Sequence, residues 1–343
     1  MERVIRACAS HDDARSLRLA VLEEIRRIVG FDAYAWLLTD PDTEVGAAPL
    51  ADVPCLPELP RLIRLKYLTT VNRWTLLNAP VGFLRTATGD QPERSLVWRE
   101  MLASYGVGDI ASLVFRDRFG TWAFLDLWRA GRDARFTGPD QEFLTGVAGP
   151  VTDALRRCQA LTFEVGGTEL DRAGPAVLAL SPELEVRAQT PETDAYLRQL
   201  VPPDDAGRPP VPASAYNVAA QLLAAERGVD SHQPSARVHL TASIWLTLRA
   251  ARMGGRGSAD ERDIAVSIEP TSPAERTLLY VRASGLSARE AELVSHLATG
   301  ADTREIAQRM FLSPNTIQDH LKSIFAKTGT RNRRTLIARA VGQ

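Results

Sequence analysis

Four polar side chains near the C-terminus are placed where they could read the bases of a nucleic acid. Asn315, Gln318, Asp319 and Lys322 follow at i, i+3, i+4 and i+7, so they share one face of a helix. An amide can pair with adenine, a carboxylate can accept from cytosine N4, and a lysine can meet a phosphate. The opposite face is apolar and consists of Ile317, Leu321, Ile324 and Phe325. A polar face held out by a small apolar core suits the major groove of DNA.

Two short helices are predicted before this one. Ser287 with Glu290 forms a capping box, the signature of a helix start, and Gly300 can end that helix in the left-handed conformation. Asp302 with Glu305 repeats the box and opens the second helix. The apolar face of the second helix consists of Ile306, Ala307 and Met310.

The helix with the polar face has its own start and stop signals. Ser313 is an N-cap followed by Pro314, which is tolerated at the first helical position because its missing N–H costs nothing there. We expect this helix to run to about Thr328 and to end at Gly329. Asn332 can cap a fourth helix. The apolar stripe of that fourth helix is Leu336, Ile337, Ala340 and Val341, and part of it could meet a second copy of the chain.

The charge of the tail favours a polyanionic partner. From Ser284 onward the chain holds 9 Lys and Arg against 5 Asp and Glu, a net charge of +4. The whole chain carries −1, so the first 283 residues carry −5. A basic tail on an acidic body indicates a nucleic-acid-binding module attached to another unit. Arg331, Arg333 and Arg334, just after the third helix, are well placed for phosphates.

This tail resembles the LuxR-type (GerE/NarL-like) DNA-binding domain over about sixty residues. The matching residues are Leu286, Ser287, Arg289, Glu290, Gly300, Glu305, Ile306, Ala307, Ser313, Thr316, Ile317, His320, Leu321, Ile324, Lys327, Gly329, Asn332 and Arg333. The resemblance implies that the third helix enters the major groove and that Gln318, Asp319 and Lys322 face DNA. Gln318 departs from the lysine that is frequent in the family. The predicted DNA-binding residues are Ser313, Asn315, Thr316, Gln318, Asp319, Lys322, Arg331, Arg333 and Arg334.

Plainer interpretations of the same residues stay open. The tail could be a small helical bundle with a solvated polar face. Asp319 could pair with Lys322 at i, i+3 on the helix surface and leave the bases unread. His320, beside the apolar stripe, is expected to be packed and hydrogen-bonded rather than a ligand or a switch.

Length and composition bound the rest of the chain. At 343 residues we expect two or three domains, with the apolar and charged shares of a globular protein. The N-terminus lacks the apolar stretch of a signal peptide, and no segment approaches the eighteen apolar residues of a membrane helix. Cys8, Cys55 and Cys158 are dispersed, which fits a reducing cytoplasm, although one of them could be a redox-sensing thiol. We therefore expect a cytoplasmic protein without a membrane partner.

The first domain is expected to span residues 1–162. The pattern predicts a helix ending at Gly30, with Ile28 in its apolar stripe, a strand over 33–39, helices near 59–67 and 95–105, strands over 110–117 and 121–129, and a long helix over 139–161. This order resembles a GAF domain, which implies a sensory α/β sandwich with a pocket between its sheet and covering helices. Aromatic residues that could line such a pocket, or simply fill the core, are Trp36, Tyr67, Trp74, Trp98, Trp122 and Trp128.

A second domain is expected over residues 170–270. Strands over 176–180, 184–188, 236–241, 244–252 and 263–269, with helices from about 192 and over 213–226, resemble a PAS domain. His232 and His239 could ligate a cofactor, but a solvated role is favoured, and neither a cofactor nor a metal is expected. Ser272 with Glu275 opens a linker helix over 272–284, and the helix-turn-helix domain follows over 285–343. Breaks rich in Pro, Gly and charge lie at 163–175, 201–212 and 254–262.

These patterns together predict an α+β multidomain protein. Its expected function is that of a one-component transcription regulator that binds double-stranded DNA as a homodimer. Its expected signal is a small ligand or a partner that acts on the GAF-like and PAS-like region, and the N-terminal domain could hold a small-molecule ligand. A sensory enzyme, or an interaction adaptor whose tail only scaffolds, is the alternative. The sequence lacks the familiar catalytic motifs, so we assign no catalytic residues and expect no enzyme. A phosphorylated receiver is disfavoured by the element order, and an acyl-homoserine-lactone sensor by the absence of aromatic neighbours around Asp40-Pro41.

Overall fold

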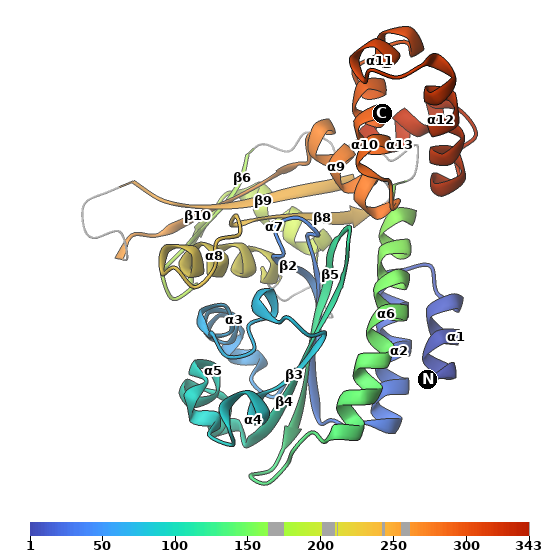
Figure 1. The fold of residues 1–343 in the computed structure, drawn as a ribbon. Helices are drawn as coiled ribbons and strands as arrows, with labels where there is room; N and C mark the ends of the chain where they lie inside the picture. The colour runs from blue at the N-terminus through green and yellow to red at the C-terminus, as the bar shows by residue number, and fades with distance from the viewer. Residues whose placement is uncertain (164–174, 201–209, 211, 242–243, 255–260, 343) are drawn as a thin grey trace.

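The architecture combines two antiparallel five-stranded sheets with a C-terminal helical domain (Figure 1). The computed structural model describes residues 1–163, 175–200, 210, 212–241, 244–254 and 261–342. The strand order is β2-β1-β5-β4-β3 in the first sheet and β7-β6-β10-β9-β8 in the second. If the five strands of each sheet are numbered in chain order, both sheets have the same strand order. The chain therefore contains two units with the same sheet topology. The α+β multidomain prediction is confirmed.

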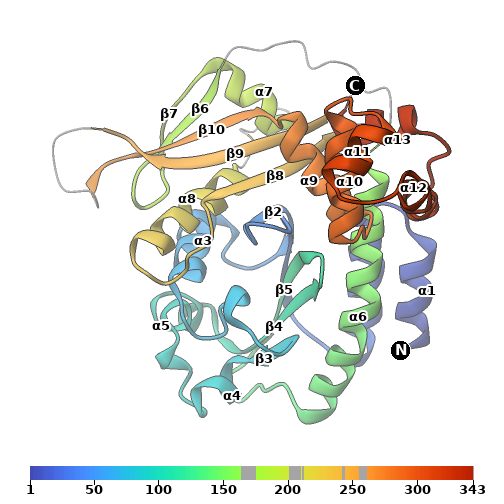
Figure 2. The same ribbon diagram turned by 45° about the horizontal axis from the view of Figure 1, so that its top comes forward.

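The first sheet has helices on both faces. Its strands are β1 (Ala33–Thr39), β2 (Gly46–Asp52), β3 (Val81–Phe83), β4 (Val107–Asp117) and β5 (Gly120–Ala130). Helices α2 (Ala14–Ile28) and α6 (Gly138–Leu161) cover one face, and α1 (Glu2–Ser10) packs outside them (Figures 1 and 2). The other face carries α3 (Leu59–Leu68), α4 (Leu84–Thr88) and α5 (Leu96–Glu100), with short 3-10 turns over Leu56–Glu58, Trp74–Leu76, Pro92–Arg94 and Leu102–Tyr105.

The elements expected in this unit are present, with two corrections. The helix expected over 95–105 is broken, because Met101 leaves the helical region at φ −145°, and a 3-10 turn follows it. Ile28, expected in the apolar stripe of its helix, is 55% exposed. The pattern also missed α1, β2, β3 and α4. Strand β2 contains Gly46 and Pro49, which are poor strand formers, and it is tolerated because it lies at the sheet edge.

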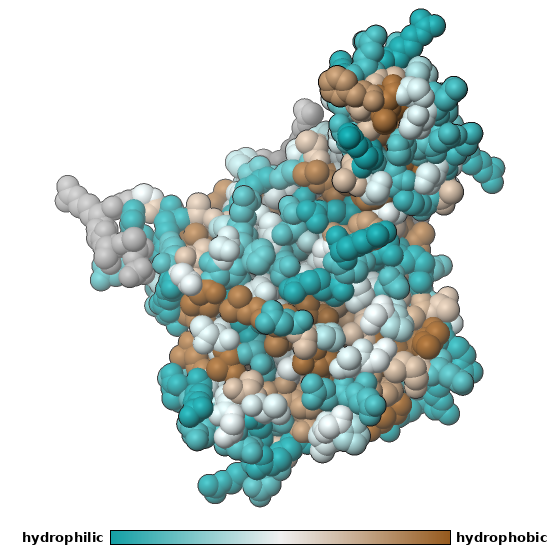
Figure 3. All heavy atoms as spheres, viewed as in Figure 1, coloured by the Kyte–Doolittle hydropathy of each residue, from teal (hydrophilic) through white to brown (hydrophobic). Residues whose placement is uncertain are grey.

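The second unit packs its longest helix against the first. It consists of β6 (Ala176–Leu180), β7 (Val186–Gln189), α7 (Pro191–Leu200), α8 (Ala213–Glu226), β8 (Ser235–Thr241), β9 (Ile244–Arg252) and β10 (Ile264–Pro270). Helix α8 lies between the second sheet and α3 and β2 of the first unit, and it is buried on almost every side. Hydrophobic residues gather where α3 and α8 meet (Figure 3). The predicted breaks at 163–175, 201–212 and 254–262 fall mostly outside the described residues.

The C-terminal domain has the caps that its sequence predicts. Helix α9 (Pro273–Ala283) joins it to the second sheet, and α10 (Ala288–Ala298), α11 (Thr303–Arg309), α12 (Pro314–Thr328) and α13 (Arg333–Val341) follow. The capping boxes of α9, α10 and α11 are all formed, and Gly329 ends α12 at φ +62°. Helix α13 packs its buried Leu336 and Ala340 on α9 and α10. Over the described ranges, no helix combines the length and apolarity needed to cross a bilayer.

Candidate DNA interface and ligand cavity

Helix α12 presents one polar face outward. Asn315, Gln318, Asp319 and Lys322 are exposed, whereas the stripe on the opposite side is at most 2% exposed at Ile317, Leu321 and Ile324. The start of the helix is held by the hydroxyl of Ser313, which accepts from the Thr316 amide at 3.1 Å. The predicted face therefore exists and stands on a rigid core. Phe325, expected in the stripe, is only partly buried.

Asp319 and Lys322 pair with each other on this face. Lys322 Nζ lies 2.9 Å from Asp319 Oδ1, and the two side chains are 78% and 72% exposed. An exposed ion pair of this kind contributes only about 0–1 kcal/mol. The pair anticipated as the plainer interpretation is thus present in the protein without DNA. Because this ion pair is weak, Lys322 remains able to bind a phosphate and Asp319 remains able to accept a hydrogen bond from a base.

The three arginines after α12 differ in their surroundings. Arg331 and Arg334 are exposed. Arg333 is half-buried, and its guanidinium donates to the hydroxyl of Thr303 at 2.6 Å, which ties the start of α13 to the start of α11. Arg333 therefore has a structural contact that the sequence pattern did not reveal. Arg331 and Arg334 are the better placed for a polyanion.

Glu290 positions α12 inside the domain. Its side chain is 4% exposed and accepts from Lys327 Nζ at 2.6 Å, from the Ser323 hydroxyl at 2.7 Å and from the Ser287 amide at 2.6 Å. Burial raises the pKa of Glu290, but these hydrogen bonds outweigh it and lower the pKa to about 2. The sequence marked Glu290 only as a capping residue. Its second role, fastening α12 to α10, depends on residues more than thirty positions away.

The comparisons agree with this geometry. Residues 284–340 match the family of bacterial regulatory proteins called the luxR family. The C-terminal segment is therefore a LuxR-type helix-turn-helix domain. The chain is 42% identical over 48 residues to the CsgBAC operon transcriptional regulatory protein of Escherichia coli, covering 14% of this chain and 22% of that one. It is 41% identical over 54 residues to the monoamine regulon transcriptional regulator of Klebsiella aerogenes, covering 16% of this chain and 24% of that one.

The matches to curated relatives cover only short parts of those proteins. A helix-turn-helix regulator of Mycobacterium bovis matches at 30% identity over 89 residues, which is 26% of this chain and 10% of the relative. Among solved structures, E. coli SdiA aligns with 99% of this chain and 96% of its own, at 11% identity and a TM-score of 0.37. A bacteriophytochrome of R. palustris aligns with 78% of this chain and 61% of its own, at 15% identity and a TM-score of 0.31.

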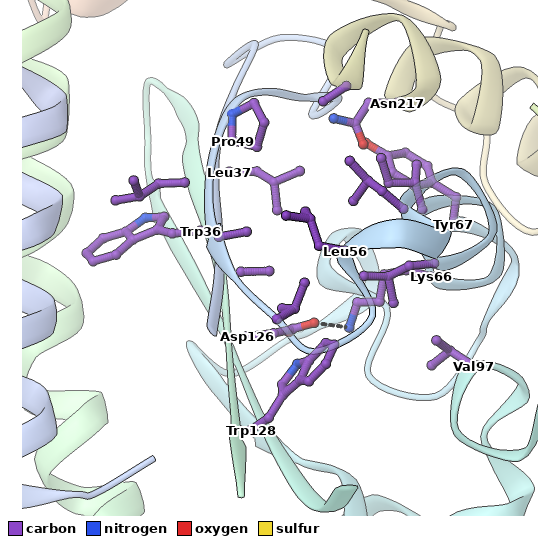
Figure 4. Close-up of a pocket in the computed structure, with 18 of the residues that line it drawn as sticks. Trp36, Leu37, Pro49, Leu56, Lys66, Tyr67, Val97, Asp126, Trp128 and Asn217 are labelled. Atoms are coloured by element: carbon purple, nitrogen blue, oxygen red, sulfur yellow. Dashed lines mark ion pairs between the residues drawn. The ribbon is translucent and has the colours of Figure 1, made fainter. Parts of the chain in front are cut away.

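A cavity of about 420 Å³ lies between the first sheet and the helices α3 and α8 (Figure 4). Its size falls within the roughly 300–1,000 Å³ of small-molecule sites. Most of its wall is aliphatic, and the side chain of Leu56, which helps to line it, is 54% exposed. The branched aliphatic residues of the wall are Leu37, Leu50, Val53, Leu56, Leu59, Leu62, Ile63, Val97, Leu102 and Ile110.

A buried ion pair lies at one end of the cavity. Lys66 Nζ is 2.8 Å from Asp126 Oδ2, and the two side chains are 10% and 5% exposed. Asp126 Oδ1 also accepts from Trp74 Nε1 at 2.9 Å and from the Ser112 hydroxyl at 2.7 Å. Lys66 Nζ stands 4.3 Å from the centre of the Trp74 ring. Because the two charges compensate each other, this end of the cavity favours an uncharged group. The lining also includes Arg15, whose charge is exposed to solvent.

Only some of the aromatic candidates face the cavity. Trp36, Tyr67, Trp74 and Trp128 are among the residues that line it. The ring of Trp36 points to the other side of the sheet, where it stacks on Phe115 with 5.3 Å between centroids (Figure 4). The remaining two lie elsewhere, with Trp98 Nε1 donating to the Val107 carbonyl and Trp122 Nε1 to Asp117. Burial raises the pKa of Tyr67 to about 12, and its hydroxyl accepts from the Gly46 amide at 2.9 Å.

The cysteines and histidines considered in the sequence have ordinary surroundings. Cys8, Cys55 and Cys158 are unpaired and buried, and burial raises the pKa of each thiol to about 11. A thiolate is thus rare at neutral pH, which argues against the redox-sensing alternative. His232 lies with Nδ1 2.6 Å from Asp230, a hydrogen bond that raises the pKa of the imidazole.

Proposed function

We propose that this protein is a one-component transcription regulator that reads DNA through α12 and senses a small molecule in the cavity beside the first sheet. The observation that carries the proposal is the exposed face of Asn315, Gln318, Asp319 and Lys322 on a LuxR-type helix-turn-helix. We propose that these residues, with Ser313, Thr316, Arg331, Arg333 and Arg334, form the DNA contact.

The proposed domains are a GAF-like sensor over residues 1–162, a PAS-like unit over 170–270, a linker helix over 272–284 and the DNA reader over 285–343. The order of helices and strands in each unit and the shared strand order of the two sheets support this division. The cavity lies in the first unit and is covered by α8 of the second. A ligand bound there would contact both units.

Charged contacts link the sensor to the linker helix. Strand β1, which lines the cavity through Ala35 and Leu37, ends at Thr39 and runs into the turn that holds Asp42. Asp42 Oδ1 lies 2.5 Å from Arg282 Nη2 on α9, and Arg282 also donates to the Phe119 carbonyl at 2.9 Å. Helix α9 in turn packs on α10 and α13 of the DNA reader. A displacement of β1 by a ligand would therefore act directly on α9.

A titration of the full chain with labelled duplex DNA tests the proposal. Fluorescence anisotropy should show binding that weakens steeply as salt rises, because its affinity begins with phosphate neutralisation. Replacing Lys322, Arg331 and Arg334 together by alanine should abolish it. Alanine at Arg3, Arg6 and Arg132, three exposed arginines outside the C-terminal domain, removes the same charge and is the matched control. If the wild-type chain shows no salt-dependent binding to duplex DNA, that result would favour the adaptor or enzyme alternative.

We further propose that the protein binds DNA as a homodimer on two half-sites about one helical turn apart, since one module contacts too few base pairs for specificity in a genome. On α13, Ile337 and Val341 are half-buried and keep part of their apolar surface at the domain exterior, while Leu336 and Ala340 are used inside the chain. Analytical ultracentrifugation with and without DNA tests this. A monomer under both conditions would exclude it.

A further inference from the structure

The end of the cavity nearest α8 carries an amide whose hydrogen bonds are unmade. Asn217 is fully buried, and neither its Nδ2 nor its Oδ1 has a hydrogen-bond partner among the described residues. The side chain projects from α8 toward the cavity (Figure 4). Burying an amide without hydrogen-bond partners destabilises the fold by about 1–3 kcal/mol. A bound molecule that makes these hydrogen bonds would remove that cost. As Asn217 belongs to the second unit, an occupant that bonds it would touch both units at once.

The opposite end of the cavity offers a second unused donor. Trp128 is 3% exposed, lines the cavity and has no hydrogen-bond partner for Nε1 in the part of the chain that the structure describes. Trp128 lies beside the Lys66–Asp126 pair, away from Asn217 (Figure 4). An indole N–H can only donate, so its partner must be an acceptor such as a carbonyl oxygen. Most of the remaining wall is aliphatic, and the exposed Arg15 also lines the cavity.

We propose that the cavity binds an uncharged, elongated molecule with an apolar body, an amide-type group paired with Asn217, and a carbonyl acceptor at Trp128. The balanced Lys66–Asp126 pair disfavours a net charge at that end, since an added ion would be buried without a counter-ion. This ligand spans the first sheet and α8, and holds the two units together. The effect of this ligand on DNA binding rests on the proposed ligand-controlled function, whereas binding of the ligand to the cavity is measured separately.

Octanediamide is a suitable probe, because it has a carbonyl and an amide at both ends of an apolar chain. Isothermal titration of the full chain should show binding of octanediamide, weaker binding of octanamide, which has one end only, and no binding of octanedioate, which is charged. Asn217→Leu keeps the approximate volume and removes the amide. Asn217→Leu and Trp128→Phe should each weaken octanediamide about fivefold, the effect of one hydrogen bond.

A matched control distinguishes this site from ordinary core packing. Trp36 Nε1 is also buried without a described partner, but its ring lies on the other side of the sheet, so Trp36→Phe should leave octanediamide affinity unchanged. Asn217→Leu should melt at or above the wild-type temperature in the absence of ligand, because the amide is unsatisfied there. A structural asparagine would instead show a lower melting temperature, and that result would overturn the assignment.

Three further results count against the proposal: no octanediamide binding at millimolar concentration, a preference for octanedioate, or equal octanediamide affinity in the wild type and both site variants. The DNA titration of the same samples separates this inference from the proposed function. Intact DNA binding without diamide binding removes only the ligand assignment. Octanediamide binding without DNA binding would exclude only the proposed function as a transcription regulator.

Discussion

Asp40 and Arg237 form a two-point ion pair across the boundary between the two sheet units. Arg237 Nε lies 2.6 Å from Asp40 Oδ2 and Arg237 Nη2 lies 2.6 Å from Asp40 Oδ1, while the Arg237 amide donates to Oδ2 at 2.8 Å. The side chain of Arg237 is 7% exposed and that of Asp40 is 1% exposed. Asp40 follows the last residue of β1, and Arg237 lies on β8, so the pair fixes the cavity-lining strand of the first unit to an edge strand of the second.

Removing the charge of Asp40 should loosen this boundary. Asp40→Asn leaves the buried Arg237 guanidinium with only its longer ion pair to Asp42 at 3.6 Å, and breaking a buried pair costs about 3–5 kcal/mol. We expect a clearly lower thermal melting temperature. Asp42→Asn, two residues away and 45% exposed, should cost less than about 1 kcal/mol. Equal melting temperatures for the two variants would show that the buried pair contributes no more than the exposed one.

The salt dependence of DNA binding should identify the phosphate contacts. If Lys322 and Arg331 each neutralise one phosphate, alanine at either position weakens binding to all sequences and flattens the salt slope by about one unit. Anisotropy titrations over a range of salt concentrations measure this slope. Arg6→Ala, which removes an exposed arginine of α1, should keep the wild-type slope. Unchanged slopes for both DNA-face variants would place the phosphates elsewhere.

Base preference should depend on Gln318 and Asp319. Loss of one bidentate base contact costs roughly 1–3 kcal/mol at that base pair. We therefore expect Gln318→Ala and Asp319→Ala to alter the sequence enriched from a random duplex library. Because Asp319 pairs with Lys322, Asp319→Ala should also raise affinity for non-specific DNA slightly. Enrichment of the wild-type site at wild-type stringency by both variants would rule out direct reading by this pair.

Acid should release α12 from α10 through Glu290. Its pKa in the folded chain is about 2, below the ordinary value of 4.5, so the ionised form is the stabilising one. That stabilisation is complete above about pH 4.5 and is lost as the pH falls toward 2. At neutral pH, Glu290→Gln should cost about 2 kcal/mol, the scale of hydrogen bonds to a charged group.

Hydrogen exchange of the α10 and α12 amides in the full chain measures this effect. Glu292→Gln, on the same helix but with a 40% exposed side chain, is the control and should exchange like the wild type. Equal protection in the two glutamine variants at neutral pH would mean that Glu290 acts only as a cap.

Local patterns were sufficient for the C-terminal domain. Its capping boxes, its Pro314 and its Gly329 act within one turn of the chain, so the sequence determined each helix boundary almost to the residue. The polar face of α12 follows from helical periodicity alone. Strands such as β1 and β9 were equally clear, because their β-branched and aromatic residues form short, well-bounded runs.

Only the tertiary structure decided which distant residues meet. The Asp40–Arg237 pair joins positions 197 residues apart, and no local signal connects them. The cavity is lined by Asn217 of α8, Lys66 of α3 and Trp128 of β5, and Arg333 donates a hydrogen bond to Thr303. Ion pairs and unsatisfied amides depend on burial and approach across elements, which a sequence period does not encode. Helix positions are thus local properties of this chain, whereas its cavity and the coupling between its units arise from packing.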